Sequence, residues 1–161
     1  MAMPYDVIPV GTVTSGRADH GNSDHWGDVF SVVTVDPDRF GVGALTGLEE
    51  FSHAEILYHF DRLPERDDYT TPQRSRGRDD LPPVGVFCDR GPRRPNRIGA
   101  TICRIVKVSD NTLTVRGLDA VIGSPVLDIK PVMRQFLPGE IVQPEWVDRL
   151  MGEYFLGGQL D

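Results

Sequence analysis

The feature that most constrains the fold is a series of short segments rich in β-branched residues, most of them followed by glycine or aspartate. Such segments are typical of β-strands joined by turns. We expect strands over residues 5–14, 28–35, 54–60, 84–88, 98–108, 112–118 and 126–130. Helices do not alternate with these segments and no GxGxxG loop is present, which excludes a dinucleotide-binding fold. The pattern predicts a mainly β protein, a small barrel of about seven strands with long functional loops, or else a sandwich.

One clear helix is expected near the C-terminus. Pro144 suits the first helical position and Glu145 the positive end of the helix dipole. An apolar face follows at helical spacing, formed by Trp146, Val147, Leu150, Met151 and Tyr154. Gly157 can end the helix. We expect this face to pack on the chain itself, with a contact to a second copy as the alternative. The 161 residues favour one domain, with a barrel over 1–140 and a helical extension over 141–161.

Composition indicates an ordinary globular protein, 39% apolar and 25% charged. No apolar run approaches the roughly 20 residues of a membrane helix, and the N-terminus lacks the pattern of a secretory signal. We therefore expect a cytoplasmic protein without a membrane partner. Cys88 and Cys103 lie in strand-like segments and are expected to be buried, reduced thiols. No HExxH or paired CxxC motif is present, so no metal site is expected.

Charge is distributed unevenly along the chain. The net charge of −7 argues by itself against a nucleic-acid partner. However, the stretch from Arg62 to Arg97 holds nine arginines against six acidic residues, a net +3, while the remainder carries −10. The guanidinium group binds two oxygens of a phosphate or carboxylate at once, so this stretch suits the recognition of such groups. A solvated loop of mixed charge is the alternative.

The loop at 90–99 (RGPRRPNRIG) combines arginine with a stiff backbone. Pro92 and Pro95 restrict the chain, and Asn96 can close a local turn. We expect a rigid loop that projects four arginines in set directions: Arg90, Arg93, Arg94 and Arg97. An ordinary proline-rich strand connection is the alternative.

Carboxylates follow apolar residues in the segment 118–131 (LDAVIGSPVLDIKP). Asp119 and Asp128 each lie at or near an expected strand end, and Lys130 shares a strand face with Asp128. Buried charges in strands need a partner. Two interpretations stay open for Asp128 and Lys130: an ion pair that fixes a loop, or a catalytic role. The polar loop 15–27 is long for a strand connection, and long ordered loops are often functional.

Four segments together resemble the TrmO/TsaA-like tRNA methyltransferases in amino-acid sequence, order and spacing. They are GTVTS at 11–15, GLEEFSHAEILYHF at 47–60, VGVFCDRGPRRPNRIG at 84–99 and LDAVIGSPVLDIKP at 118–131. The resemblance covers about residues 8–135. It implies a compact β-barrel, usually a homodimer, that binds S-adenosylmethionine (SAM) without a Rossmann fold. It further implies methylation of N6 of the threonylcarbamoyl-modified adenosine in the tRNA anticodon loop.

The resemblance also implies a set of SAM contacts. They fall on the matching segments, at His25, Trp26, Asp61, Arg62, Arg90, Ile98, Leu118, Asp119, Ala120 and Val121. Trp26 is a candidate for a cation–π contact with the sulfonium, and Asp119 for a contact with the adenosyl group.

We further expect a small catalytic set beside the cofactor. Arg94 and Asn96 would orient the modified base or its carboxylate. Asp128 would accept the proton that leaves N6, directly or through water, with Lys130 beside it.

Departures from the family pattern bear on the substrate more than on the fold. Arg97 stands where the family often has a second proline, Ile122 where aspartate is frequent and Val132 where an aromatic residue is common. Longer relatives also carry an additional C-terminal domain. Two alternatives to tRNA methylation therefore stay open: a SAM-sensing or interaction module without catalysis, and a small-molecule methyltransferase.

Overall fold

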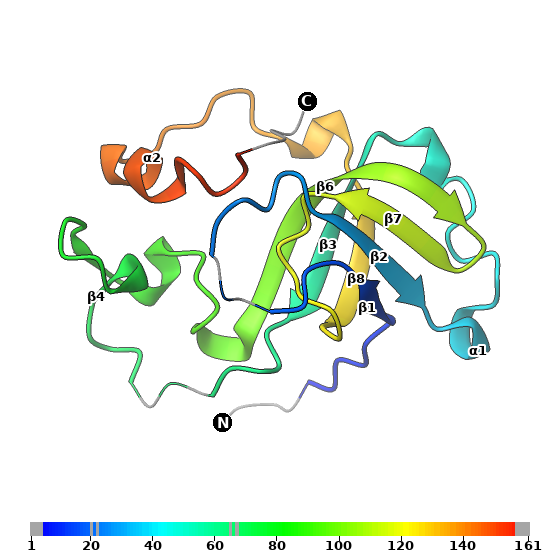
Figure 1. Cartoon of the computed structure of the whole chain (residues 1–161), viewed down its shortest axis with the longest axis horizontal. Coiled ribbons are helices and arrows are strands. Elements are labelled where there is room, and N and C mark those ends of the chain that lie inside the picture. The colour runs from blue at the N-terminus through cyan, green and yellow to red at the C-terminus, as the bar shows by residue number, and fades with distance from the viewer. Residues whose placement is uncertain (1–4, 20, 22, 65, 67, 157–161) are drawn as a thin grey trace.

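The computed structural model describes residues 5–19, 21, 23–64, 66 and 68–156. Its centre is a closed antiparallel barrel with strand order β1-β2-β7-β6-β3-β8 (Figure 1). The strands are β1 (Gly11–Ser15), β2 (Phe30–Val35), β3 (His53–His59), β6 (Ile98–Ser109), β7 (Thr112–Arg116) and β8 (Pro125–Pro131). The mainly β barrel expected from the sequence is confirmed, with six strands in its wall.

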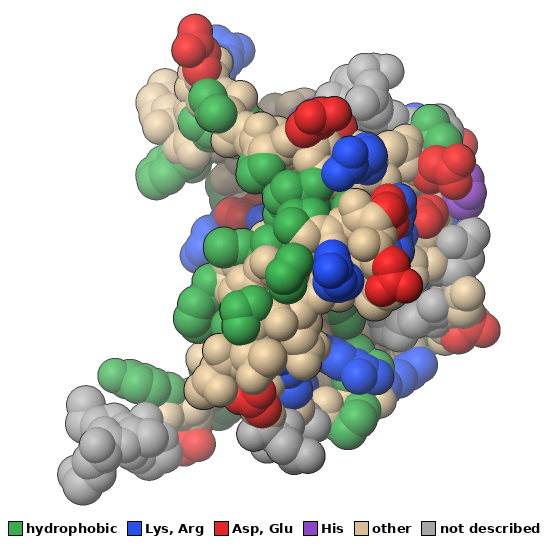
Figure 2. All heavy atoms as spheres, turned by 90° about the vertical axis from the view of Figure 1, so that its left-hand side faces the viewer, with side chains coloured by type: hydrophobic (Ala, Val, Ile, Leu, Met, Phe, Trp, Pro, Cys, Tyr) green, Lys and Arg blue, Asp and Glu red, His purple; other side chains and the backbone are tan. Residues whose placement is uncertain are grey.

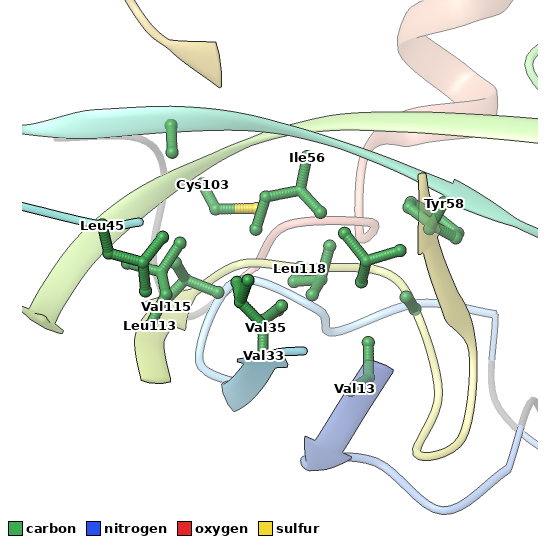
Figure 3. Close-up of a cluster of buried hydrophobic side chains, with 13 residues drawn as sticks. Val13, Val33, Val35, Leu45, Ile56, Tyr58, Cys103, Leu113, Val115 and Leu118 are labelled. Atoms are coloured by element: carbon green, nitrogen blue, oxygen red, sulfur yellow. The ribbon is translucent and has the colours of Figure 1, made fainter. Parts of the chain in front are cut away.

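The barrel interior is filled by the inward-facing residue of every second strand position. In β3, Ala54, Ile56 and Tyr58 are buried while their neighbours are partly exposed, as the two-residue period of a strand requires. Val13, Val33, Leu113 and Val115 join them from the opposite wall, and Leu45 and Tyr58 lie toward opposite ends of the cluster (Figure 3). This packing fixes which strand ends meet at each mouth of the barrel.

The prediction of a strand over residues 84–88 is wrong. Pro83–Val84 forms only a short strand, β5, which pairs with β4 (Gln73–Arg74) outside the barrel. Val86–Cys88 is a single 3-10 turn, and Phe87 is 77% exposed. Proline cannot donate to a strand ladder, which limits pairing at this point. The first expected strand, over residues 5–14, is also shorter, since the strand begins only at Gly11.

Most helical elements lie outside the barrel. α1 (Pro37–Phe40) is capped by Asp36, whose side chain accepts from the Asp38 amide. α2 (Glu145–Met151) is the expected C-terminal helix. The remaining helical turns are 3-10 segments, at Leu48–Glu50, Ser75–Gly77, Val86–Cys88, Pro95–Arg97 and Arg134–Phe136.

The apolar face of α2 packs on the protein as expected. Leu150 is buried, and Trp146, Val147 and Met151 are partly buried. The helix ends at Met151 rather than continuing, and Gly157 lies outside the described residues. Across the described ranges, the structure contains no helix with the length and apolar character needed to cross a membrane.

Candidate functional site

A single carboxylate, that of Asp119, gathers hydroxyl groups from three parts of the chain. The Tyr58 hydroxyl donates to Asp119 Oδ1 over 2.6 Å. The Thr101 hydroxyl donates to the same oxygen, and the Tyr154 hydroxyl donates to Oδ2. Hydrogen bonds to an ionised acceptor are stronger than neutral ones. Asp119 is therefore the centre of a polar cluster at one mouth of the barrel.

The chain around Asp119 is anchored by burial. Gly117 leaves β7 with a φ of 90°, and its amide donates to the Val29 carbonyl over 3.0 Å. A side chain is disfavoured in this left-handed region, which explains glycine here. Leu118 and Ala120 are fully buried on either side of Asp119. The carboxylate is thus held on a rigid segment rather than on a mobile loop.

The tyrosines beside Asp119 are held as neutral donors. Burial raises the pKa of Tyr58 well above its ordinary value, and the negative charge of Asp119 raises it further. The pKa of Tyr154 is raised by the same two causes in the same order. Both phenols therefore stay protonated, and each hydroxyl donates a hydrogen bond to the carboxylate.

The first long loop is stabilised by Arg17. Its guanidinium donates to the carbonyls of Asp24 and His25, each over 2.9 Å, and stacks 3.9 Å from the Trp26 ring centroid. The Trp26 indole donates to the Ser23 carbonyl over 3.1 Å, and Trp26 is only 2% exposed. The Arg17 guanidinium therefore occupies the face of the Trp26 ring that was expected to contact the SAM sulfonium. A ligand here would meet backbone atoms of Trp26 rather than its ring.

The C-terminal segment pairs with this loop. The amides of His25 and Trp26 donate to the carbonyls of Glu153 and Tyr154, over 3.0 and 2.8 Å. His25 itself has a φ of 62° and an exposed side chain.

Three further arginines connect the loops around this mouth. Arg62 donates to the Ile122 carbonyl, which ties the end of β3 to the segment after Asp119. Arg90 donates to the Ala100 carbonyl over 2.5 Å. Arg76 forms an ion pair with Asp24 at 2.9 Å.

The arginine-rich loop after residue 89 is held by hydrogen bonds within itself and to neighbouring segments. Arg94 donates to the Asp89 carbonyl over 2.8 Å, and Arg97 to the Leu63 carbonyl over 2.7 Å. Asn96 is exposed, with a φ of 62°. Asp89 is held by the Ser75 hydroxyl over 2.6 Å. Arg94 and Arg97 thus shape the loop, while Arg93 and Asn96 are exposed.

Asp128 and Lys130 form the ion pair of the structural interpretation, at 2.5 Å and with both side chains about half exposed. They flank Ile129, which packs against the core, so they lie on the outer face of β8. Asp128 also borders an apolar hollow of about 440 Å³ near the other mouth, beside Val10, Val35 and Leu45. The structure does not bring this pair into the Asp119 cluster.

The predicted cofactor residues divide by exposure. Trp26, Leu118, Ala120 and Val121 have buried side chains, so a ligand would reach mainly their backbone. Exposed side chains are found at His25, Asp61, Arg62, Arg90 and Ile98. Among the described ranges, no group of three or more acidic, histidine or cysteine side chains is arranged to hold a metal ion.

Sequence reasoning missed Tyr58, Thr101 and Arg17 as site residues. It placed Tyr154 only on the apolar face of the expected C-terminal helix, whereas α2 ends at Met151 and Tyr154 follows it. Tyr58 belongs to the inward-facing row of β3, and a phenol in such a row requires a polar partner. That rule signals a buried acceptor, although it does not say which carboxylate supplies it.

Family comparison identifies the chain's relatives. The family described as tRNA-methyltransferase O N-terminal domain matches residues 22–136. A probable S-adenosyl-L-methionine-binding protein of Pyrococcus abyssi is 36% identical over 122 residues, which are 76% of this chain and 62% of that protein. The chain thus spans less than two thirds of this relative's length.

Other relatives differ in how much of their length is matched. A probable S-adenosyl-L-methionine-binding protein of Methanothermobacter thermautotrophicus is 36% identical over 132 residues, 80% of this chain and 90% of that protein. The human tRNA (adenine(37)-N6)-methyltransferase is 36% identical over 104 residues, 63% of this chain and 23% of that protein. Among solved structures, TrmO from Pseudomonas aeruginosa superposes with a TM-score of 0.72 at 26% identity, over 91% of this chain and 64% of that chain.

Proposed function

This chain belongs to the tRNA-methyltransferase O N-terminal domain family, and we propose that it transfers a methyl group from SAM to N6 of adenosine 37 in tRNA. We propose further that this adenosine carries the threonylcarbamoyl group. The observation that carries the proposal is the convergence of His25–Trp26, Arg62 and Leu118–Val121 on one mouth of the barrel, around the carboxylate of Asp119.

The residues at this mouth fit SAM by their chemistry. SAM carries a sulfonium cation, an amino-acid group, ribose hydroxyls and an adenine. Asp119 supplies a fixed negative charge that suits the sulfonium cation of SAM. Arg62 and Arg90 offer partners for the carboxylate of the SAM amino-acid group. The backbone of Leu118–Val121, anchored by buried side chains, offers amides and carbonyls for the adenine edge.

Catalysis in this proposal is placement and charge control by the protein. Bound SAM supplies the electrophilic methyl group. The rigid segments on either side of Asp119 orient the donor, and alignment of N6 with the methyl provides much of the rate enhancement. Arg94 and Asn96 are proposed to orient the modified base, Asn96 through its exposed side chain. A proton-accepting role for Asp128 stays a prediction, since Asp128 is paired with Lys130 on the outer wall.

The tRNA is proposed to lie against the face that carries α2 and β4. Figure 2 shows basic and acidic side chains beside a central group of apolar ones on this face. Arg93 is exposed in the arginine-rich loop and is a candidate for contact with phosphate. Because tRNA is the proposed substrate, we place the reaction in the cytoplasm.

We also propose that the protein is a homodimer. The connection between β8 and α2 exposes apolar side chains at Met133, Phe136, Leu137, Ile141 and Val142. Exposed apolar patches commonly mark interfaces. Light scattering during size-exclusion chromatography tests this, with twice the 17.9 kDa chain mass expected and the monomer mass contradicting it.

A SAM-binding module without methyl transfer is the second candidate. Two observations favour it: the relatives named only as SAM-binding proteins, and the net charge of −7. A small-molecule methyltransferase is the third candidate and shares the charge argument.

The decisive experiment incubates the protein with methyl-labelled SAM and bulk tRNA, with and without the threonylcarbamoyl group. Label in the modified tRNA alone supports the full proposal. Equal labelling of both tRNAs contradicts the threonylcarbamoyl requirement, and SAM binding without any labelling favours the sensor. tRNA affinity that falls steeply with salt supports contact with phosphates, and affinity that is independent of salt contradicts it.

A further inference from the structure

The segment that follows α2 contacts both loops of the proposed donor site, although it lies beyond the family-matched residues 22–136. Consecutive carbonyls, those of Glu153 and Tyr154, accept from the consecutive amides of His25 and Trp26. This arrangement fixes the backbone direction of the first loop at the point where a ligand would meet it.

The side chain of Tyr154 reaches the second loop. Its hydroxyl donates to Asp119 Oδ2, on the oxygen opposite the one that accepts from Tyr58 and Thr101. One residue thus holds two loops in a fixed relation: through its carbonyl it contacts Trp26, and through its hydroxyl it contacts Asp119.

The segment also has contacts outside these two loops. Leu150 of α2 is buried, and Arg78 donates to the Arg149 carbonyl over 3.2 Å. The Arg76 guanidinium lies 5.6 Å from the Tyr154 ring centroid. Phe155 packs edge-on against the same ring at 4.8 Å between centroids. Tyr154 is therefore positioned before any ligand arrives.

We propose that residues 152–156 are part of the methyl-donor site, with Tyr154 as a positioning residue that fixes the Asp119 carboxylate relative to the His25–Trp26 backbone. This inference rests on the proposed function, because it assumes that the donor lies between these loops. Tyr154 does not act on the methyl group. It sets the geometry of the groups that would hold the donor.

The test measures SAM affinity by calorimetry in the full chain, for the wild type, Tyr154→Phe and Tyr154→Ala. Tyr154→Phe keeps the ring and backbone but loses the bond to Asp119, and it is expected to weaken SAM binding about tenfold, the effect of losing one hydrogen bond to a charged group. Tyr154→Ala is expected to weaken binding further. Tyr5→Phe is the matched control, since Tyr5 is 82% exposed, and its affinity should equal that of the wild type.

Two readouts separate positioning from a general loss of stability. The KM for SAM should rise in Tyr154→Phe while the KM for tRNA stays within about twofold of the wild type, an effect confined to ground-state binding of the donor. Amide hydrogen exchange at His25 and Trp26 should accelerate in Tyr154→Ala but not in Tyr5→Phe.

The outcomes distinguish this inference from the proposed function. Unchanged SAM affinity in both Tyr154 variants overturns the inference alone. Weaker binding in the variants without methylation of any tRNA supports the inference and overturns the proposed activity. A folded wild type that binds no SAM overturns both.

Discussion

The Tyr58 hydroxyl donates to Asp119 Oδ1 over 2.6 Å, across 61 residues of chain. This hydrogen bond joins an inward-facing position of β3 to the segment after β7. It thereby connects the hydrophobic core directly to the polar cluster around Asp119. Tyr58 is 1% exposed, so its ring is part of the core while its hydroxyl is part of the site. Changes at this position should affect both stability and ligand binding.

Removal of the Tyr58 hydroxyl should destabilise the protein. Tyr58→Phe retains the ring but takes one donor from a carboxylate, and we expect the free energy of unfolding to fall by about 1–3 kcal/mol. Urea denaturation measures this, with Tyr5→Phe as the control that should change it by less than about 0.5 kcal/mol. Equal unfolding free energies for Tyr58→Phe and the control would show that the bond contributes nothing.

The close approach of Gly99 to Tyr58 explains the glycine at the end of the RPNRIG sequence. A Cβ at Gly99 would lie 2.4 Å from the nearest atom of the Tyr58 ring, and that ring is buried. Gly99→Ala should therefore force the ring to move and reduce stability by about 1–3 kcal/mol. Gly85→Ala is the matched control, because a Cβ there meets no atom within 4 Å. Similar melting temperatures for the two variants would contradict this account.

Stability should fall at alkaline pH because of the tyrosines beside Asp119. The fold raises the pKa of Tyr154, so it stabilises the protonated phenol. This contribution is complete below the unfolded value of about 10 and is lost as the pH rises above it. Urea denaturation between about pH 9 and about pH 11 should show a shallower decline in Tyr154→Phe than in the wild type. Parallel declines would contradict the raised pKa.

The two cysteines should react at very different rates. Cys88 lies exposed in a 3-10 turn, whereas Cys103 is fully buried and its pKa is raised first by burial and then by the charge of Asp119. A thiol reagent should modify one cysteine in the native protein and both after unfolding. The Cys88→Ser variant should show no fast reaction, and a fast reaction in that variant would mean that the core opens readily.

Sequence patterns predicted the strands of the barrel wall well because their residues alternate between inside and outside, as in β3 and β7. The prediction of a strand over 84–88 was wrong because a short apolar run does not show whether another strand is available to pair with it. Pro83, which lacks an amide hydrogen, also precedes the run. The prediction that Cys88 is buried was wrong for the same reason, since Cys88 is exposed.

The candidate site was predictable only in part. Asp119 was found through the motif that contains it, whereas its donors Tyr58, Thr101 and Tyr154 come from distant segments whose local sequence does not identify Asp119 as their acceptor. The Asp128–Lys130 ion pair was one of two interpretations that strand geometry left open, and its formation on the outer wall follows from the inward position of Ile129. Residue spacing predicts which side chains pair within one strand. Contacts between distant segments depend on how the strands close into the barrel, which local spacing does not show.

A crystal structure with SAM tests the account most directly, because every role proposed above depends on where the donor binds. We expect the adenosyl group against the backbone of Leu118–Val121, beside the His25–Trp26 loop, with the methyl group open to solvent for an incoming base. Density for SAM elsewhere, for example in the apolar hollow beside Val35 and Leu45 near the other mouth, would contradict the assignment of the site.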